Sequence, residues 1–78
     1  MNEKIIEILK KICPNVNFEE SNDFISDGLI DSFDVVLITN SIEEIFDINI
    51  PGELINRENF SSLNALSLLI DKCRKSNT

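Results

Sequence analysis

The sequence of 78 residues contains no histidine, tyrosine or tryptophan, and only two residues each of cysteine, glycine and proline. Without histidine, a serine or cysteine nucleophile lacks its most common general base. The two cysteines, Cys13 and Cys73, also lack the histidine partners of a mixed zinc site. We therefore expect no catalytic site and no metal site, and we interpret both cysteines as reduced.

Lysine and arginine are missing from residues 12–56, a span of 45 residues that contains ten of the fourteen acidic residues. All seven basic residues lie outside this span, and the net charge of the chain is −7. Such a field repels nucleic acid and anionic membranes and attracts basic protein surfaces. We therefore expect partners with basic docking patches and no nucleic-acid partner.

Long hydrophobic runs are also missing. No stretch approaches the roughly 18 apolar residues that a membrane-spanning helix requires. The first residues, Met1 to Lys4, lack the basic-then-apolar pattern of a signal peptide. We expect a single domain over residues 1–78, cytoplasmic and monomeric, with no membrane insertion.

Apolar residues recur at helical spacing in three segments, 2–13, 32–46 and 63–75. One or two short helical turns are expected over 53–60, with Asn56 as a cap, and a long connection over 15–31 is expected to be pinned by Phe24. These elements predict an all-α fold, a small four-helix bundle of three long helices and one short helix. The predicted core residues are Ile5, Leu9, Ile12, Phe24, Val36, Ile42, Phe46, Ile50, Phe60, Leu63, Leu66 and Leu69.

The triplet Asp31-Ser32-Phe33 lies where the acidic connection meets the second helix. Asp31 is a good N-cap, which places Ser32 exposed in the first helical turn. Carboxylates at Asp31 and Asp34 flank the serine, and no base is available to activate it. This setting suits a hydroxyl that another enzyme modifies, although Ser32 could also be no more than part of a helix cap.

A calcium loop is a competing use of the same aspartates. Residues 23–34 place acids at loop positions 1, 5, 9 and 12 and Gly28 at position 6, as an EF-hand does. However, Ile25 occupies position 3, and the shorter Asp34 replaces glutamate at position 12. We therefore do not expect EF-hand binding. An acidic helical domain that binds partners or ions remains the rival functional class.

Two segments, Gly28-Leu29-Ile30-Asp31-Ser32-Phe33 and Ile42-Glu43-Glu44-Ile45-Phe46-Asp47-Ile48-Asn49-Ile50-Pro51, resemble the acyl carrier protein family. The resemblance implies that a phosphopantetheinyl transferase attaches 4′-phosphopantetheine from coenzyme A to Ser32. It also implies that Asp31 helps to present the serine to that enzyme. The terminal thiol of the arm would then hold an acyl or aminoacyl group as a thioester, and the chain itself would be a substrate of enzymes and not an enzyme.

The cargo follows less directly from the resemblance. Residues 28–30 read Gly-Leu-Ile where fatty-acid carriers have Leu-Gly-Ala, and Phe33 replaces their common leucine. Residues 51–60 resemble D-alanyl carrier proteins. The resemblance thus implies a carrier in fatty acid or related acyl biosynthesis, part of lipid metabolism, with a stand-alone aminoacyl carrier of D-alanyl or peptidyl type as the alternative.

The second helix is expected to form the surface that partner enzymes contact. Its acids would face their basic patches, and Leu37 and Asn40, one turn apart beyond Ser32, would form the apolar centre of the contact. For Leu37, packing in the core is an equal alternative. The residues of this partner surface are Phe33, Asp34, Leu37, Asn40, Glu43, Glu44 and Asp47.

Overall fold

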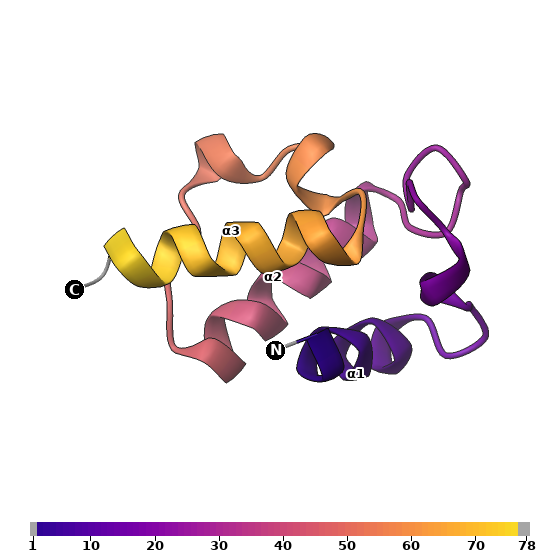
Figure 1. Ribbon diagram of the computed structural model, residues 1–78, viewed down its shortest axis with the longest axis horizontal. Helices are drawn as coiled ribbons and strands as arrows, with labels where there is room; N and C mark the ends of the chain where they lie inside the picture. The colour runs from indigo at the N-terminus through magenta and orange to yellow at the C-terminus, as the bar shows by residue number, and fades with distance from the viewer. Residues whose placement is uncertain (1, 77–78) are drawn as a thin grey trace.

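The computed structural model describes the backbone of residues 2–76 and the side chains of residues 3–74. Over this range the chain is helical and has no strand (Figure 1). The α-helices are α1 (Asn2–Ile12), α2 (Ser32–Phe46) and α3 (Leu63–Ser76), and the single-turn 3₁₀ helices are η1 (Phe18–Glu20), η2 (Gly52–Leu54) and η3 (Glu58–Phe60). The all-α class is confirmed, and the bounds of the three long helices lie within one residue of those expected.

The fourth helix of the expected bundle is not confirmed, because residues 52–60 form the two separate turns η2 and η3. Asparagine side chains hold the backbone between these turns. The Asn59 N–H donates to Asn56 Oδ1 at 2.9 Å, and Asn59 Nδ2 donates to the Leu54 carbonyl at 2.8 Å. These bonds satisfy backbone groups that a continuous helix would pair internally. Asn56 bonds to this backbone as a cap would, although η3 begins only at Glu58 and Arg57 occupies its N-cap position.

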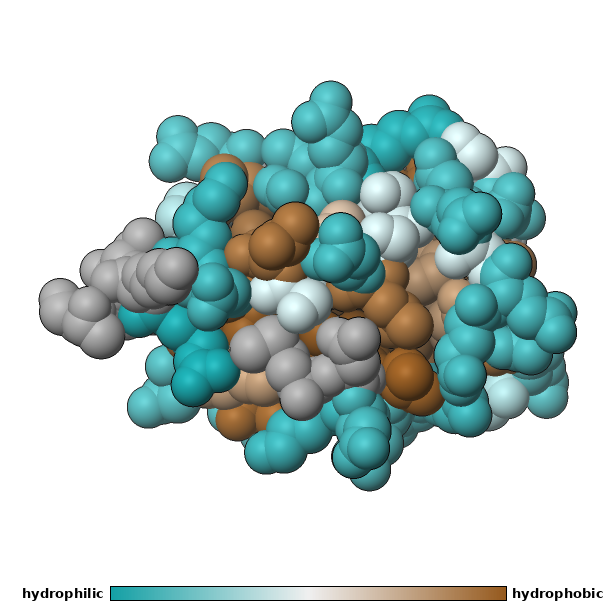
Figure 2. All heavy atoms as spheres, in the orientation of Figure 1, coloured by the Kyte–Doolittle hydropathy of each residue, from teal (hydrophilic) through white to brown (hydrophobic). Residues whose placement is uncertain are grey.

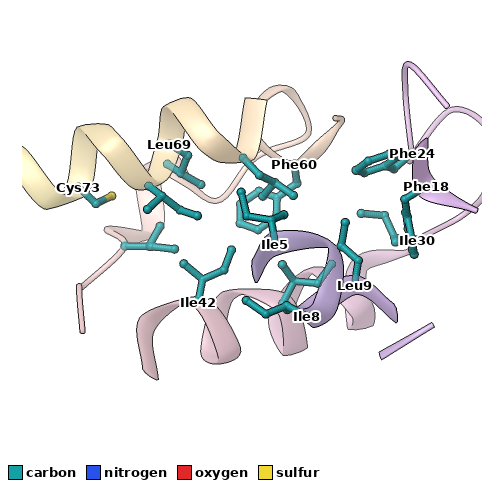
Figure 3. Close-up of a cluster of buried hydrophobic side chains, with 14 of the residues drawn as sticks. Ile5, Ile8, Leu9, Phe18, Phe24, Ile30, Ile42, Phe60, Leu69 and Cys73 are labelled. Atoms are coloured by element: carbon teal, nitrogen blue, oxygen red, sulfur yellow. The ribbon is translucent and has the colours of Figure 1, made fainter. Parts of the chain in front are cut away.

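A single hydrophobic core lies between α1, α2, α3 and η3 (Figure 3). Of the twelve predicted core residues, eight are buried, and Ile12, Phe46 and Leu63 are partly buried against them. The core also contains residues that the prediction omitted, namely Ile8, Phe18, Ile30, Ile38, Ile48, Ile70 and Cys73. Several of these lie in loops, where helical periodicity gives no guide to burial.

The prediction was wrong for Val36, whose side chain is 55% exposed. The apolar residues of α2 cover more of its circumference than the core can use. Val35, Ile38 and Ile42 recur at helical spacing and face the core. Val36 instead lines the groove beside Ser32 that is described below.

The long connection between α1 and α2 is anchored by aromatic side chains, as expected for Phe24. The rings of Phe18 and Phe24 pack edge to face with centroids 5.0 Å apart. The Phe24 N–H donates to the Ser61 carbonyl at 2.7 Å, which joins the connection to the start of α3. In Figure 3, these rings lie at one end of the core and Cys73 at the other. Cys13 and Cys73 are both free thiols.

On one face of the molecule, hydrophilic residues form the rim (Figure 2). On the face shown in Figure 2, hydrophilic residues surround the hydrophobic side chains that gather toward the middle. Among the helices that the structure describes, none combines the length and the apolar character needed to cross a bilayer.

Candidate functional site

Asp31 and Asp34 form a reciprocal cap at the start of α2. Asp31 Oδ1 accepts from the Asp34 N–H at 3.0 Å, and Asp34 Oδ2 accepts from the Asp31 N–H at 3.2 Å. Ser32 is therefore the first residue of the helix and not its cap. Its side chain is exposed, and no hydrogen bond among the described residues involves its hydroxyl. The serine is free to be modified without the helix losing its N-terminal cap.

A groove of about 560 Å³ opens beside Ser32. One wall is formed by the end of the connection and the first turns of α2, with Ile30, Asp31, Ser32, Val35 and Val36. The opposite wall is formed by Ile25, Ile55, Asn56 and Arg57. The exposure of Val36 is explained by its place in this groove. The groove offers an apolar surface that begins at the serine.

Large apolar side chains are exposed around the serine. Phe33 is 70% exposed on α2, and Ile55, across the groove, is 36% exposed. Together with Val36 they form an apolar patch on an otherwise acidic part of the chain. Patches of this kind with a polar rim are typical of contact surfaces.

The wall that contains Ile25 is held by a turn around Asp23. The Asp23 Oδ1 atom accepts from the Ile25 N–H at 3.1 Å and from the Ser26 N–H at 3.0 Å. The hydrogen bond from the Ser26 backbone is the main reason why the pKa of the Asp23 carboxyl lies below its usual range, and the charge of Arg57 lowers it further. Gly28, with φ of +73°, then reverses the chain in the left-handed region that glycine favours.

Arg57 joins the two chain segments that form this wall, the turn at residues 25–26 and the segment 55–57. Its guanidinium donates a hydrogen bond to the hydroxyl of Ser26, 31 residues earlier in the chain. It is also the one basic residue among those that line the groove. The first basic residue after the long acidic span therefore lies in the groove that begins at Ser32.

The acids with EF-hand spacing are occupied by turns and caps. Asp23 holds its turn, Asp27 accepts from the Ser21 hydroxyl at 2.5 Å, and Asp31 and Asp34 cap α2. In the described part of the chain, no group of three or more histidine, cysteine, aspartate or glutamate residues is placed to hold a metal ion. All four acids are thus engaged by local hydrogen bonds, three of them to backbone groups and Asp27 to a side chain.

The expected partner surface divides into two groups. Phe33, Asn40 and Glu44 are exposed and recur at helical spacing on one face of α2, and Asp47, which is also exposed, caps the end of the helix. Leu37, Asp34 and Glu43 are half-buried. The two acids of this second group also have internal roles, because Asp34 belongs to the cap and Glu43 Oε2 accepts from the Ile50 N–H at 2.9 Å.

The two thiols are poorly suited to nucleophilic chemistry. Burial, followed by the charge and a hydrogen bond of the neighbouring Asp34 carboxylate, raises the pKa of the Cys13 thiol. Burial also raises the pKa of the Cys73 thiol. A raised pKa reduces the thiolate fraction, which is the reactive form.

Several residues of the groove were not predicted to lie near Ser32. Val36 was assigned to the core, and Val35, Ile55 and Arg57 were assigned no role. Val36 could have been identified as a neighbour of Ser32, since it lies one helical turn after it. Arg57 carried a weaker signal, as the residue that ends the acidic span.

Similar proteins are known, although no protein-family model matches the chain. An aminoacyl carrier protein of Agrobacterium fabrum is 39% identical over 70 residues, covering 85% of this chain and 83% of the relative. A D-alanyl carrier protein of Lactococcus lactis subsp. lactis is 24% identical over 79 residues, covering 99% of this chain and 100% of the relative. A D-alanyl carrier protein of Lactococcus lactis subsp. cremoris is 26% identical over 74 residues, covering 92% and 94%. The similarity to the aminoacyl carrier protein, at 39% identity over 85% of the chain, shows that the chain belongs to the carrier protein family.

Proposed function

We propose that the protein is an aminoacyl carrier that bears 4′-phosphopantetheine on Ser32. The observation that carries the proposal is the position of the serine. Ser32 is exposed at the first position of α2, its hydroxyl is not used by the fold, and Asp31 supplies the cap. In a member of the carrier family, such a serine is the natural attachment point.

The surroundings of Ser32 fit this prosthetic group. The phosphodiester would lie at the N-terminus of α2, where the helix dipole favours negative charge. The arm would leave the serine beside the groove, whose apolar walls can hold a flexible chain against the protein. When bound, the group supplies a terminal thiol that carries an aminoacyl unit as a thioester.

Attachment transfers a phosphopantetheinyl group to the Ser32 oxygen. The oxygen forms a bond to the phosphorus that carries the pantetheine unit of coenzyme A, and the bond from this phosphorus to the adenosine bisphosphate leaving group breaks. The hydroxyl proton would pass to a base of the transferase. Asp31 is proposed to present the serine and its magnesium ion to that enzyme.

For the cargo, we infer an aminoacyl group and not a fatty acyl chain. The relatives reported above are named as aminoacyl or D-alanyl carriers, so they give no specific support to fatty acid biosynthesis. An aminoacyl thioester also keeps a positively charged amine, which the acids around Ser32 attract. The protein is thus proposed to be a carrier that other enzymes load and unload, without catalysis of its own.

The exposed face of α2 is the proposed docking surface for those enzymes. Phe33 would be its apolar centre, and Glu44 and Asp47 would meet basic side chains of the partner. Asn40 lies between them on the same face. Because Glu43 holds the backbone of Ile50, a substitution of Glu43 would disturb the fold as well as any docking.

Loading experiments test the proposed cargo. The modified protein is offered to a D-alanine adenylating enzyme, to adenylating enzymes for other amino acids, and to a fatty acyl transferase with acyl coenzyme A. We expect a hydroxylamine-sensitive mass gain of one amino acid, and none for the unmodified protein. Loading by the acyl transferase alone would reject the aminoacyl assignment but keep the carrier assignment.

A further inference from the structure

Arg57 has donors to spare in the groove beside Ser32. A guanidinium group carries five N–H donors in a planar fork that matches phosphate oxygens. The bond to the Ser26 hydroxyl engages a neutral acceptor. Arg57 is exposed and forms part of the wall that faces Asp31 and Ser32. The Ser26 hydroxyl thus holds the side chain without neutralising its charge, although the Asp23 carboxylate interacts with that charge from the same loop.

The region around Ser32 otherwise opposes an added negative charge. A phosphodiester on Ser32 would lie between the carboxylates of Asp31 and Asp34. The N-terminus of α2 compensates only partly, since the Asp34 N–H is already bonded to Asp31. Among the residues that line the groove, Arg57 alone supplies a positive charge.

We propose that Arg57 is a positioning residue that binds the phosphodiester on Ser32 and holds the prosthetic arm along the groove. The inference rests on the proposed function, because it requires the arm to be attached to this serine. If this is so, Arg57 forms different interactions in the unmodified and the modified protein. In the unmodified protein, Arg57 ties η3 to the loop through Ser26; in the modified protein, it also pairs with an anion.

The test compares unmodified and fully modified protein, each confirmed by intact mass, for the wild type and for Arg57→Gln, Arg57→Lys and Ser26→Ala. Modification of the wild type is expected to raise the urea midpoint by about 0.3–0.5 M, the size of an exposed charged contact. Arg57→Gln should lose most of this increase, and Ser26→Ala should keep it, because the guanidinium remains. Arg57→Lys, which keeps the charge without the fork, should retain part of it, and 1 M salt should reduce it.

Phosphorus NMR gives a second measurement that does not depend on stability. The ³¹P chemical shift of the modified wild type should change when the protein is unfolded in urea. In modified Arg57→Gln, the ³¹P chemical shift of the folded protein should already be close to that of the unfolded protein. An equal midpoint increase in wild type and Arg57→Gln, with unchanged ³¹P shifts, would overturn the inference and leave the carrier function standing. If the wild type gains no mass, the proposed function itself fails and the inference falls with it.

Discussion

The carboxylates of Asp31 and Asp34 each accept the backbone N–H of the other residue, at 3.0 and 3.2 Å, and Ser32 lies between them. Asp31 therefore has two possible roles: its side-chain oxygen caps α2, and its negative charge lies beside the serine. Variants of Asp31 can remove one role and keep the other. Asparagine caps as well as aspartate does, whereas alanine does not. Asp31→Asn is therefore expected to change the free energy of unfolding by less than about 0.5 kcal/mol, and Asp31→Ala to lower it by about 1 kcal/mol.

The same pair of variants tests the proposed role of Asp31 in modification. Loss of one charged contact of about 1.5–3 kcal/mol lowers a rate roughly 10- to 100-fold. We expect Asp31→Asn to slow the transferase reaction to this extent while the protein remains stable, as measured by kcat/KM and by urea unfolding. If Asp31→Asn is modified at the wild-type rate, Asp31 acts only as a cap.

We expect Gly28 to be required because of its backbone conformation, and not because a larger side chain would clash with its neighbours. Its φ is +73°, yet an added Cβ would meet nothing within 4 Å. Gly28→Ala should therefore cost about 1–2 kcal/mol of unfolding free energy, the conformational penalty of a left-handed alanine. Gly28→Asn should cost less, because asparagine tolerates this conformation. Gly52→Ala is the matched control, since Gly52 has no positive φ and equal room, and it should be nearly neutral in urea unfolding.

Asp47 is unfavourable for stability at the end of α2. It has a left-handed φ of 54° and places a negative charge at the C-terminal end of the helix dipole. Asp47→Gly should stabilise the protein by about 1 kcal/mol, and Asp47→Asn by about half as much. If Asp47 contributes to docking, both variants should raise the KM of a loading enzyme with little change in kcat. Unchanged KM at low salt would remove Asp47 from the docking surface.

The pKa of Asp23 predicts a dependence of stability on pH. The carboxyl has a lowered pKa in the folded protein, chiefly because it accepts the Ser26 backbone N–H. The folded state then binds the proton less tightly than the unfolded state, so the contribution of Asp23 is complete above the ordinary pKa of about 3.9 and is lost as the pH falls through the lowered value. Asp23→Asn keeps an oxygen acceptor for the turn but cannot titrate. Its urea midpoint should fall less steeply than that of the wild type below about pH 4, and parallel curves would contradict the assignment.

Local hydrogen bonding made α2 predictable from the sequence. The cap at Asp31, the start at Ser32 and the end at Phe46 depend on residues a few positions apart. The same kind of interaction explains why the fourth helix is replaced by two turns. The side chains of Asn56 and Asn59 bond to nearby backbone groups, in competition with the bonds of a helix. The sequence shows where these asparagines lie, but it does not show whether their bonds or the helix will be formed.

Tertiary packing made the groove harder to predict. The many apolar residues of α2 did not indicate which side would face the core, so Val36 was assigned to it, whereas it lines the groove. Arg57 and Ser26 meet across 31 residues, and no periodicity or local motif connects them. The position of Ser32 at the start of α2 could thus be predicted from the sequence, whereas the groove beside it could be found only from the fold.

The most direct test of the carrier function is intact mass spectrometry after incubation with coenzyme A, magnesium and a broad-specificity phosphopantetheinyl transferase. We predict that the wild type gains the mass of one phosphopantetheinyl group. Ser41→Ala, which changes another serine of α2, should gain the same mass. Ser32→Ala should gain none while remaining folded, because Asp31 still caps the helix. No gain in the wild type, or a gain that persists in Ser32→Ala, would contradict the account.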